Sequence, residues 1–252
     1  MEDMANAALA RGMTHICFTE HMDLDFPDGP DEPGSIFLLD VDAYHAEWET
    51  LAERFEGRLD IRFGLELGLQ PQVAVSNQAI VADHSWDFII GSCHIAEGRD
   101  PYYPSFYEGR SLEESYRAFF RSTLDNLHAC EDIDVLGHLD YIVRYAPGGE
   151  ESYHPEEYAD ITDEILRFII ERDIGLDINT SAMIRGCREP NPCTALIRRY
   201  RELGGELITI GSDAHRPEDV GGSFERVRDI LLSEGYTRYY TYTGRRPDAH
   251  PL

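Results

Sequence analysis

Apolar and polar positions along the chain alternate between two kinds of segment. Short runs rich in β-branched and aromatic residues are mostly followed by longer stretches with helical spacing. This alternation is typical of parallel strands joined by helices, so it predicts an α/β fold built as a parallel β/α barrel. The predicted barrel strands cover residues 14–19, 59–67, 86–93, 134–137, 174–179 and 207–211.

The segments between these runs carry signals that begin and end helices. Asp40 can cap a helix that continues through Phe55, and Ser-Leu-Glu-Glu from Ser111 is a capping box. Pro155 stands at a first-turn position, where proline is favoured. Residues 181–192 are predicted as a loop, and residues 236–244 as a terminal extended strand. The remaining predicted helices cover residues 1–12, 70–83, 111–130, 155–173, from 193 to about 204, and a segment that ends near 235.

Each predicted barrel strand ends in a polar residue. The C-terminal ends of parallel strands gather at one face of a barrel, so residues that are distant in the sequence converge there. Histidines and carboxylates gathered in this way are suitable ligands for divalent metal ions. The candidate metal ligands are His21, Glu66, His94, His138, Asp213 and His215.

Two local patterns make this expectation more specific. Asp213 and His215 stand two residues apart just past a strand, so they can bind adjacent metal ions. Glu66 lies in Gly-Leu-Glu-Leu-Gly, where the glycines permit close backbone approach and the carboxylate can bridge two cations. A buried, hydrogen-bonded carboxylate is the alternative for Glu66. Clustered divalent ions activate a shared water and neutralise phosphate oxygens, which favours phosphoester hydrolysis.

Arginine is the candidate for substrate binding. All 22 basic residues are arginine, and the absence of lysine excludes Schiff-base chemistry by this chain. Arg144, six residues after His138, and Arg185, in the loop after residues 174–179, are expected to hold a phosphate group through bidentate hydrogen bonds. Solvation at the surface is the alternative for both arginines.

Composition and charge disfavour large partners, and the predicted metal cluster favours a small-molecule phosphate ester as the substrate. The length of 252 residues suits one β/α barrel. The net charge of −26 disfavours nucleic acid, because an acidic surface repels phosphates. No apolar run approaches the ~20 residues that span a bilayer, and the acidic start lacks the apolar core of a secretory signal. We therefore expect no membrane partner and a cytoplasmic location, whereas the oligomeric state stays open.

The cysteines do not indicate a disulfide framework. Their number, 5, is odd, and no C-x-x-C pair occurs. Cys93 stands next to His94 and is a candidate nucleophile by position. On a strand, however, it should point away from His94 and into packing, as a buried thiol.

Six motifs together resemble the polymerase-and-histidinol-phosphatase (PHP) superfamily, and within it the histidinol-phosphatases. They are TEH, GLELGL, IIGSCH, GHLDYIVRY, DINTSAMIR and TIGSDAH, and the resemblance extends from about residue 1 to residue 235. It implies a distorted (βα)7 TIM-like barrel, as a single domain over residues 1–252, with as many as three divalent ions of zinc, manganese or iron. The implied reaction is hydrolysis of L-histidinol phosphate to L-histidinol and phosphate.

The resemblance also implies a role for each candidate ligand. Glu66 would bridge two metal ions and, with Asp213, hold the metal-bound hydroxide. His94 and His138 would be ligands of the second ion, and Asp213 would serve the first. The ligands of the third ion would be His21 and His215.

The chain departs from the family pattern at its start. Members of the family open with a strand that carries His-x-His, whereas this sequence begins with the helix predicted over residues 1–12. We therefore expect the first barrel strand to be missing and fewer metal ions to bind. A late start site or a truncated chain is the expected explanation, and a naturally inactive homologue is the alternative. Three functions stay open here: histidinol-phosphate hydrolysis, hydrolysis of another small phosphoester, and a catalytically impaired binding protein.

Overall fold

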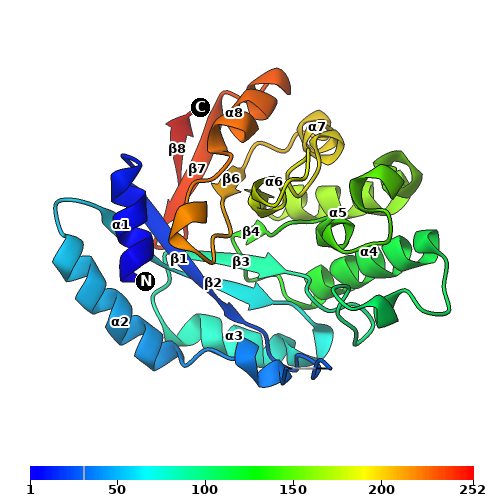
Figure 1. Cartoon of the computed structure of the whole chain (residues 1–252), viewed down its shortest axis with the longest axis horizontal. Helices are drawn as coiled ribbons and strands as arrows, with labels where there is room; N and C mark the ends of the chain where they lie inside the picture. The colour runs from blue at the N-terminus through cyan, green and yellow to red at the C-terminus, as the bar shows by residue number, and fades with distance from the viewer. Residues whose placement is uncertain (31) are drawn as a thin grey trace.

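The computed structural model describes residues 1–30 and 32–252, and its main element is one curled parallel sheet (Figure 1). The strands follow one another in chain order from β1 to β6, and each neighbouring pair is parallel. The predicted alternation of strands and helices is confirmed as an α/β half-barrel. The strands are β1 (His15–Met22), β2 (Asp60–Gly68), β3 (Phe88–Ser92), β4 (Val135–Leu136), β5 (Gly175–Asn179) and β6 (Ile208–Gly211).

Helices connect the strands and surround the sheet (Figure 1). They are α1 (Glu2–Ala10), α2 (Val41–Phe55), α3 (Ala74–Asp83), α4 (Leu112–Ala129), α5 (Ala159–Glu171), α6 (Ser181–Ile184), α7 (Thr194–Glu202) and α8 (Phe224–Ser233). Asp40 caps α2 and Ser111 opens α4 with a capping box, as predicted. The short α6 lies in the segment predicted as a loop, so that prediction is wrong for its first turn. No helix in the described part of the chain is long and apolar enough to cross a membrane.

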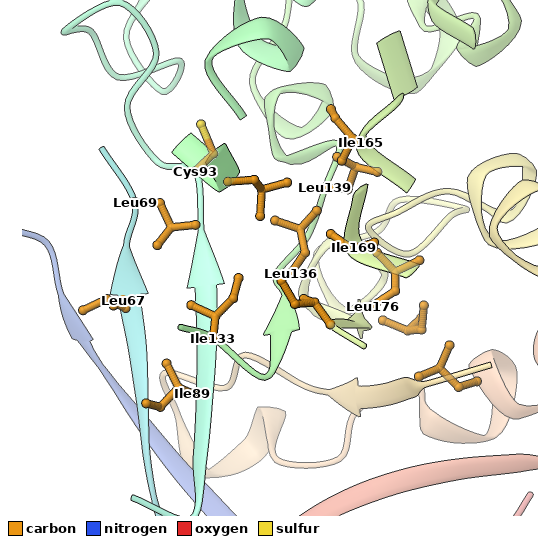
Figure 2. Packing of buried hydrophobic residues seen from close by; sticks show 14 of the residues in the cluster. Leu67, Leu69, Ile89, Cys93, Ile133, Leu136, Leu139, Ile165, Ile169 and Leu176 are labelled. Atoms are coloured by element: carbon orange, nitrogen blue, oxygen red, sulfur yellow. The ribbon is translucent and has the colours of Figure 1, made fainter. Parts of the chain in front are cut away.

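Buried aliphatic side chains fix the register of the sheet. Ile89, Leu136 and Leu176 come from three strands and are fully buried (Figure 2). Ile165 and Ile169 of α5 pack beside them. Burying a side chain of this size is worth ~1.5–3 kcal/mol, and a one-residue slip would exchange the side chains on the two faces of a strand and disrupt this packing. The polar residues at the strand ends are therefore held in place by the core.

A C-terminal hairpin lies at the opposite end of the sheet from the predicted ligands. It consists of β7 (Arg238–Thr243) and β8 (Arg246–Pro251). The ring of Tyr242 packs 4.9 Å from that of Phe88, at the start of β3. The sequence predicts β7 but not β8, because β8 contains two prolines and few residues that favour strands.

The sheet is open between its two outer strands. In residues 1–30 and 32–252, β1 and β6 pair on one side only, and both line a cavity of about 900 Å³. Pairing these edges would close the sheet into a barrel and remove the exposed backbone groups.

Candidate metal centre

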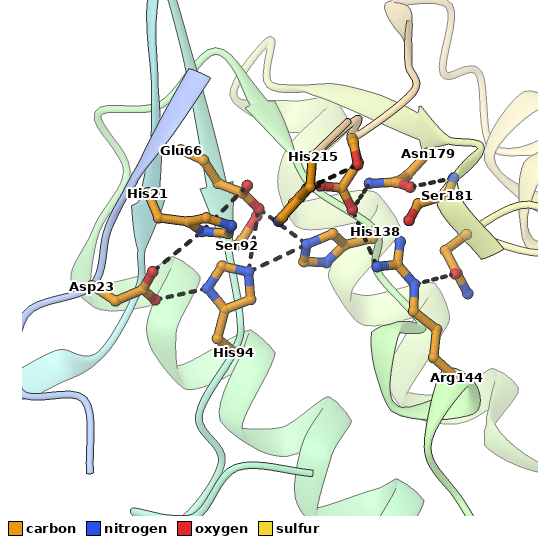
Figure 3. A network of polar contacts seen from close by, with 12 residues as sticks. His21, Asp23, Glu66, Ser92, His94, His138, Arg144, Asn179, Ser181 and His215 are labelled. Atoms are coloured by element: carbon orange, nitrogen blue, oxygen red, sulfur yellow. Dashed lines mark hydrogen bonds and ion pairs between the residues drawn. The ribbon is translucent and has the colours of Figure 1, made fainter. Parts of the chain in front are cut away.

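The C-terminal ends of β2, β3 and β4 bring three candidate ligands together (Figure 3). Glu66 Oε1 lies 3.0 Å from His138 Nε2 and 3.2 Å from His94 Nε2, and the two Nε2 atoms are 3.3 Å apart. A tetrahedral zinc site with bonds of ~2.1 Å has ligand atoms about 3.4 Å apart. All three side chains are buried, so the cluster has the spacing and the donor atoms that a small divalent ion requires.

The second oxygen of Glu66 faces another histidine. His21 Nδ1, at the end of β1, lies 3.6 Å from Glu66 Oε2. His21, Glu66 and His94 offer ligand atoms that all lie within 4.8 Å of one another. Glu66 thus has one oxygen toward His94 and His138 and the other toward His21, which is the placement that a bridging carboxylate needs.

Asp23 orients two of these histidines, and sequence reasoning missed it. Its Oδ1 lies 2.7 Å from His94 Nδ1, and its Oδ2 lies 3.4 Å from His21 Nδ1. In a neutral His94, this bond keeps the proton on Nδ1 and leaves the Nε2 lone pair for a cation. Gly68 makes the arrangement possible, because a Cβ there would collide with the Asp23 carboxylate. The available signal was the position of Asp23 two residues after His21, which places both on one face.

Ser92 supports Glu66 from the end of β3. Its hydroxyl donates to Glu66 Oε1 at 2.7 Å, so this oxygen is held by a hydrogen bond as well as by the two imidazoles. A Cβ at Gly137 would collide with the Ser92 hydroxyl. Glycine at this position therefore leaves the space that the supporting residue occupies.

Burial and charge shift the pKa values of the cluster. Burial would raise the pKa of Glu66, but His21, with hydrogen bonds from His138 and His94, holds it well below its ordinary value. Burial would lower the pKa of His94, but Asp23 and Glu66 hold it well above the ordinary value. Burial lowers the pKa of His138 despite its hydrogen bond to Glu66. Glu66 is therefore a carboxylate and His138 a neutral imidazole, whereas His94 would have to lose a proton to bind a cation.

Two candidate ligands stand in strained backbone. The φ angle is +21° at His138 and +47° at Asp213, in the left-handed region that side chains rarely adopt. Such conformations cost ~1–3 kcal/mol each and concentrate at functional sites. Both residues lie two positions after the last residue of a strand, where this turn of the backbone redirects the side chain.

Asp213 belongs to a second charged group beside the first. Its Oδ2 accepts hydrogen bonds from Arg144 Nη1 at 3.2 Å and from Asn179 Nδ2 at 3.1 Å. His215 Nδ1 lies 3.6 Å from Asp213 Oδ1, and the His215 ring lies 5.8 Å from that of His21. His215 and Arg144 thus lie next to the cluster around Glu66 (Figure 3), and Asp213 contacts both of them.

Arg185 and Cys93 are not part of this cluster. The Arg185 side chain is exposed at the end of α6, and it forms no hydrogen bond or ion pair with the residues that the structure describes. Cys93 is buried against Asn126, whose Nδ2 lies 3.4 Å from the sulfur. Burial raises the pKa of the Cys93 thiol to about 11, so it is not an activated nucleophile.

Comparison with known proteins gives the family. The model of the PHP domain matches residues 1–181. The chain belongs to the PHP domain family. It is 33% identical over 213 residues to a protein named "Probable histidinol-phosphatase" from Clostridium acetobutylicum, a match that covers 83% of this chain and 78% of the relative. It is 30% identical over 242 residues to "Histidinol-phosphatase" of Lactococcus lactis, which covers 96% of this chain and 87% of the relative.

A solved structure extends the likeness to the whole fold. The crystal structure of the histidinol phosphate phosphatase from Lactococcus lactis, complexed with zinc, L-histidinol and phosphate, matches with a TM-score of 0.88. The identity is 29%, and the match covers 98% of this chain and 92% of the other. The PHP resemblance in the sequence motifs is therefore confirmed.

Proposed function

We propose that this protein is a metal-dependent phosphomonoesterase that hydrolyses L-histidinol phosphate to L-histidinol and phosphate. The observation that carries the proposal is the convergence of Glu66, His94 and His138, whose ligand atoms lie 3.0–3.3 Å apart. The family and the names of the relatives support the substrate. The zinc, L-histidinol and phosphate in the related crystal structure support both the metal and the substrate class.

The metal ions would be held by donors from the strand ends. Imidazole and carboxylate donors suit zinc, manganese and iron, and we propose zinc because the related structure contains it. Divalent ions in such a site provide a nucleophilic water near neutral pH and neutralise phosphate oxygens. The proposed ligands are His21, Glu66, His94, His138, Asp213 and His215. Glu66 and Asp213, from the two neighbouring charged groups, would orient the nucleophile.

Arg144 would bind the phosphate group. Its side chain is only 6% exposed, and its Nη2 has no hydrogen-bond partner among the described residues. A buried donor without a partner is costly, and a phosphate oxygen would satisfy it with a charge-assisted bond. The centre of the Tyr141 ring lies 5.3 Å from Arg144 Cζ, so the ring limits the movement of the guanidinium on that side. Arg185 is the second proposed phosphate-binding residue, because its exposed side chain is not engaged elsewhere.

We also propose that one more strand closes the sheet between β1 and β6. The unpaired edges and the cavity of about 900 Å³ between them support this, and the closed form would be a single-domain (βα)7 TIM-like barrel to which residues 1–252 contribute six strands. A strand carrying His-x-His at this place would add ligands beside His21 and Asp213. Without this strand, fewer metal ions would bind and turnover would be impaired. The second candidate function is therefore that of a catalytically impaired protein.

The experiment is a panel of small phosphomonoesters at matched metal loading, with and without an added N-terminal strand carrying His-x-His. We expect kcat/KM for L-histidinol phosphate to exceed that of nucleotide and sugar phosphates by at least about tenfold, or ~1.4 kcal/mol of barrier. If kcat/KM is highest for another phosphomonoester, that ester is the substrate instead of L-histidinol phosphate. A protein that binds no metal in either form would be the impaired binding protein instead.

A further inference from the structure

The guanidinium of Arg144 is held by an asparagine from a distant loop. Arg144 Nε donates to Asn191 Oδ1 at 2.7 Å, and Nη1 donates to Asp213 Oδ2 at 3.2 Å. The guanidinium points from its stem toward Asn179 and Ser181 (Figure 3). The two hydrogen bonds therefore fix the plane of the guanidinium and leave its Nη2 edge for a ligand.

Asn191 is itself fixed through both its side chain and its backbone. It is 3% exposed, and its Nδ2 donates to Asp140 Oδ1 at 2.7 Å. Its backbone pairs with Asn179 in an isolated bridge, with N–H···O distances of 2.9 and 2.8 Å. An amide offers an acceptor to a guanidinium and a donor to a carboxylate at the same time, which neither Asp nor Leu can do. An asparagine therefore suits the position between the Arg144 guanidinium and the Asp140 carboxylate.

Asp140 completes this network from the segment that carries Arg144. Its side chain is fully buried, and its Oδ2 accepts a hydrogen bond from the Cys193 backbone N–H at 2.9 Å. Both carboxylate oxygens are thus engaged by the loop that contains Asn191. Hydrogen bonds to charged groups are stronger than neutral ones, so the series from Asp140 through Asn191 to Arg144 resists rotation of the guanidinium.

We propose that Asn191, held by Asp140, is the positioning residue that aims Arg144 at the substrate phosphate. The inference rests on the proposed function in taking Arg144 as a phosphate-binding group. Asn191 acts through Arg144 Nε and sets where the Nη1 and Nη2 donors meet the phosphate oxygens. A guanidinium without this anchor would lose the fixed fork geometry that bidentate binding requires.

Inorganic phosphate is the probe, titrated by calorimetry into the zinc-loaded full chain. Asn191→Ala should weaken phosphate binding about tenfold, which corresponds to ~1.4 kcal/mol. It should raise KM for L-histidinol phosphate by a similar factor while zinc content stays unchanged. Asn77→Ala is the matched control, because Asn77 is also a buried asparagine but donates to the Gly68 carbonyl at 3.0 Å. The control should lower the melting temperature without changing phosphate affinity.

A double-mutant cycle separates positioning from general destabilisation. In an Arg144→Ala background, Asn191→Ala should have no further effect on phosphate affinity, because the group that it positions is gone. An equal loss in both backgrounds would overturn the proposal, as would wild-type phosphate affinity in Asn191→Ala. If Asn191→Ala does not fold, Asp140→Asn takes its place in the cycle, because an amide has one acceptor oxygen and loses the hydrogen bond either to Asn191 Nδ2 or to the Cys193 N–H.

The outcome also distinguishes this inference from the substrate assignment. If the wild-type protein with the closing strand supplied binds phosphate but does not hydrolyse L-histidinol phosphate, only the substrate assignment fails, and the cycle still decides the role of Asn191. If the zinc-loaded wild-type chain binds no phosphate, Arg144 is not a phosphate-binding group and the positioning proposal is overturned.

Discussion

Replacing Asp23 with asparagine tests whether the carboxylate behind the histidines sets the metal affinity. Asp23 is 3% exposed and lies 2.7 Å from His94 Nδ1. The substitution keeps the size of the side chain and removes its charge. Loss of such a partner typically lowers metal affinity by about 10–100-fold. We therefore expect the zinc Kd of Asp23→Asn to rise by this factor, or ~1.4–2.7 kcal/mol.

The direction of the effect follows from the charges around Asp23. Burial would raise the pKa of Asp23, but His94 and His21 hold it below its ordinary value, so the group is ionised. The carboxylate makes the His94 ring a better donor to a cation through Nε2. An amide at this position accepts the same hydrogen bond without the charge, so His94 becomes a weaker ligand.

The assay is a zinc titration against a competing chelator at alkaline pH, where neither variant has to release a proton from His94, with thermal unfolding measured in parallel. Asp134→Asn is the control, because Asp134 is also buried but binds the Ile89 backbone N–H at 2.7 Å and Arg245 at 3.1 Å. The control should change stability and leave the zinc Kd unchanged. A zinc Kd for Asp23→Asn within about twofold of wild type, or ~0.4 kcal/mol, would refute the reasoning.

Three further outcomes are expected. His138→Ala should lower phosphate release by several orders of magnitude while the circular dichroism spectrum is retained, and a rate within about twofold of wild type would argue against a ligand role. Arg144→Lys and Arg185→Lys should raise KM or lower kcat, because lysine lacks the bidentate fork, and unchanged kinetics in both would argue against phosphate binding by either arginine. Zinc binding near neutral pH should release a proton from His94, whose pKa is held above its ordinary value despite burial, so affinity should rise with pH up to that raised pKa. Calorimetry in buffers of different ionisation enthalpy measures this proton, and zinc binding without proton release would show that His94 is already neutral.

The strand ends could be predicted from the sequence for a physical reason. Parallel strands are buried on both faces, so they form almost continuous apolar runs, and the first polar residue after each run marks its C-terminal end. Glu66, His94 and His138 stand at such strand ends, and the structure brings their ligand atoms within 3.0–3.3 Å. The capped starts of α2 and α4 were predictable because capping depends on residues three positions apart.

Contacts between distant segments could not be predicted in the same way. Asn191 and Arg144 are 47 residues apart, and only the folded chain shows that the loop before α7 pairs with the end of β5. Asp23 gains its role from Gly68, which leaves space for its carboxylate on the neighbouring strand. The strand β8 forms through its pairing with β7 rather than from its own β-propensity.

The most direct test of the metal centre is phosphate release from L-histidinol phosphate before and after metal removal, with the closing strand supplied. We predict that a chelator abolishes release, that added zinc restores it in the wild-type chain, and that no divalent metal restores it in Glu66→Gln. Release that continues unchanged in the chelated protein, or in Glu66→Gln, would contradict a metal centre built on Glu66, His94 and His138.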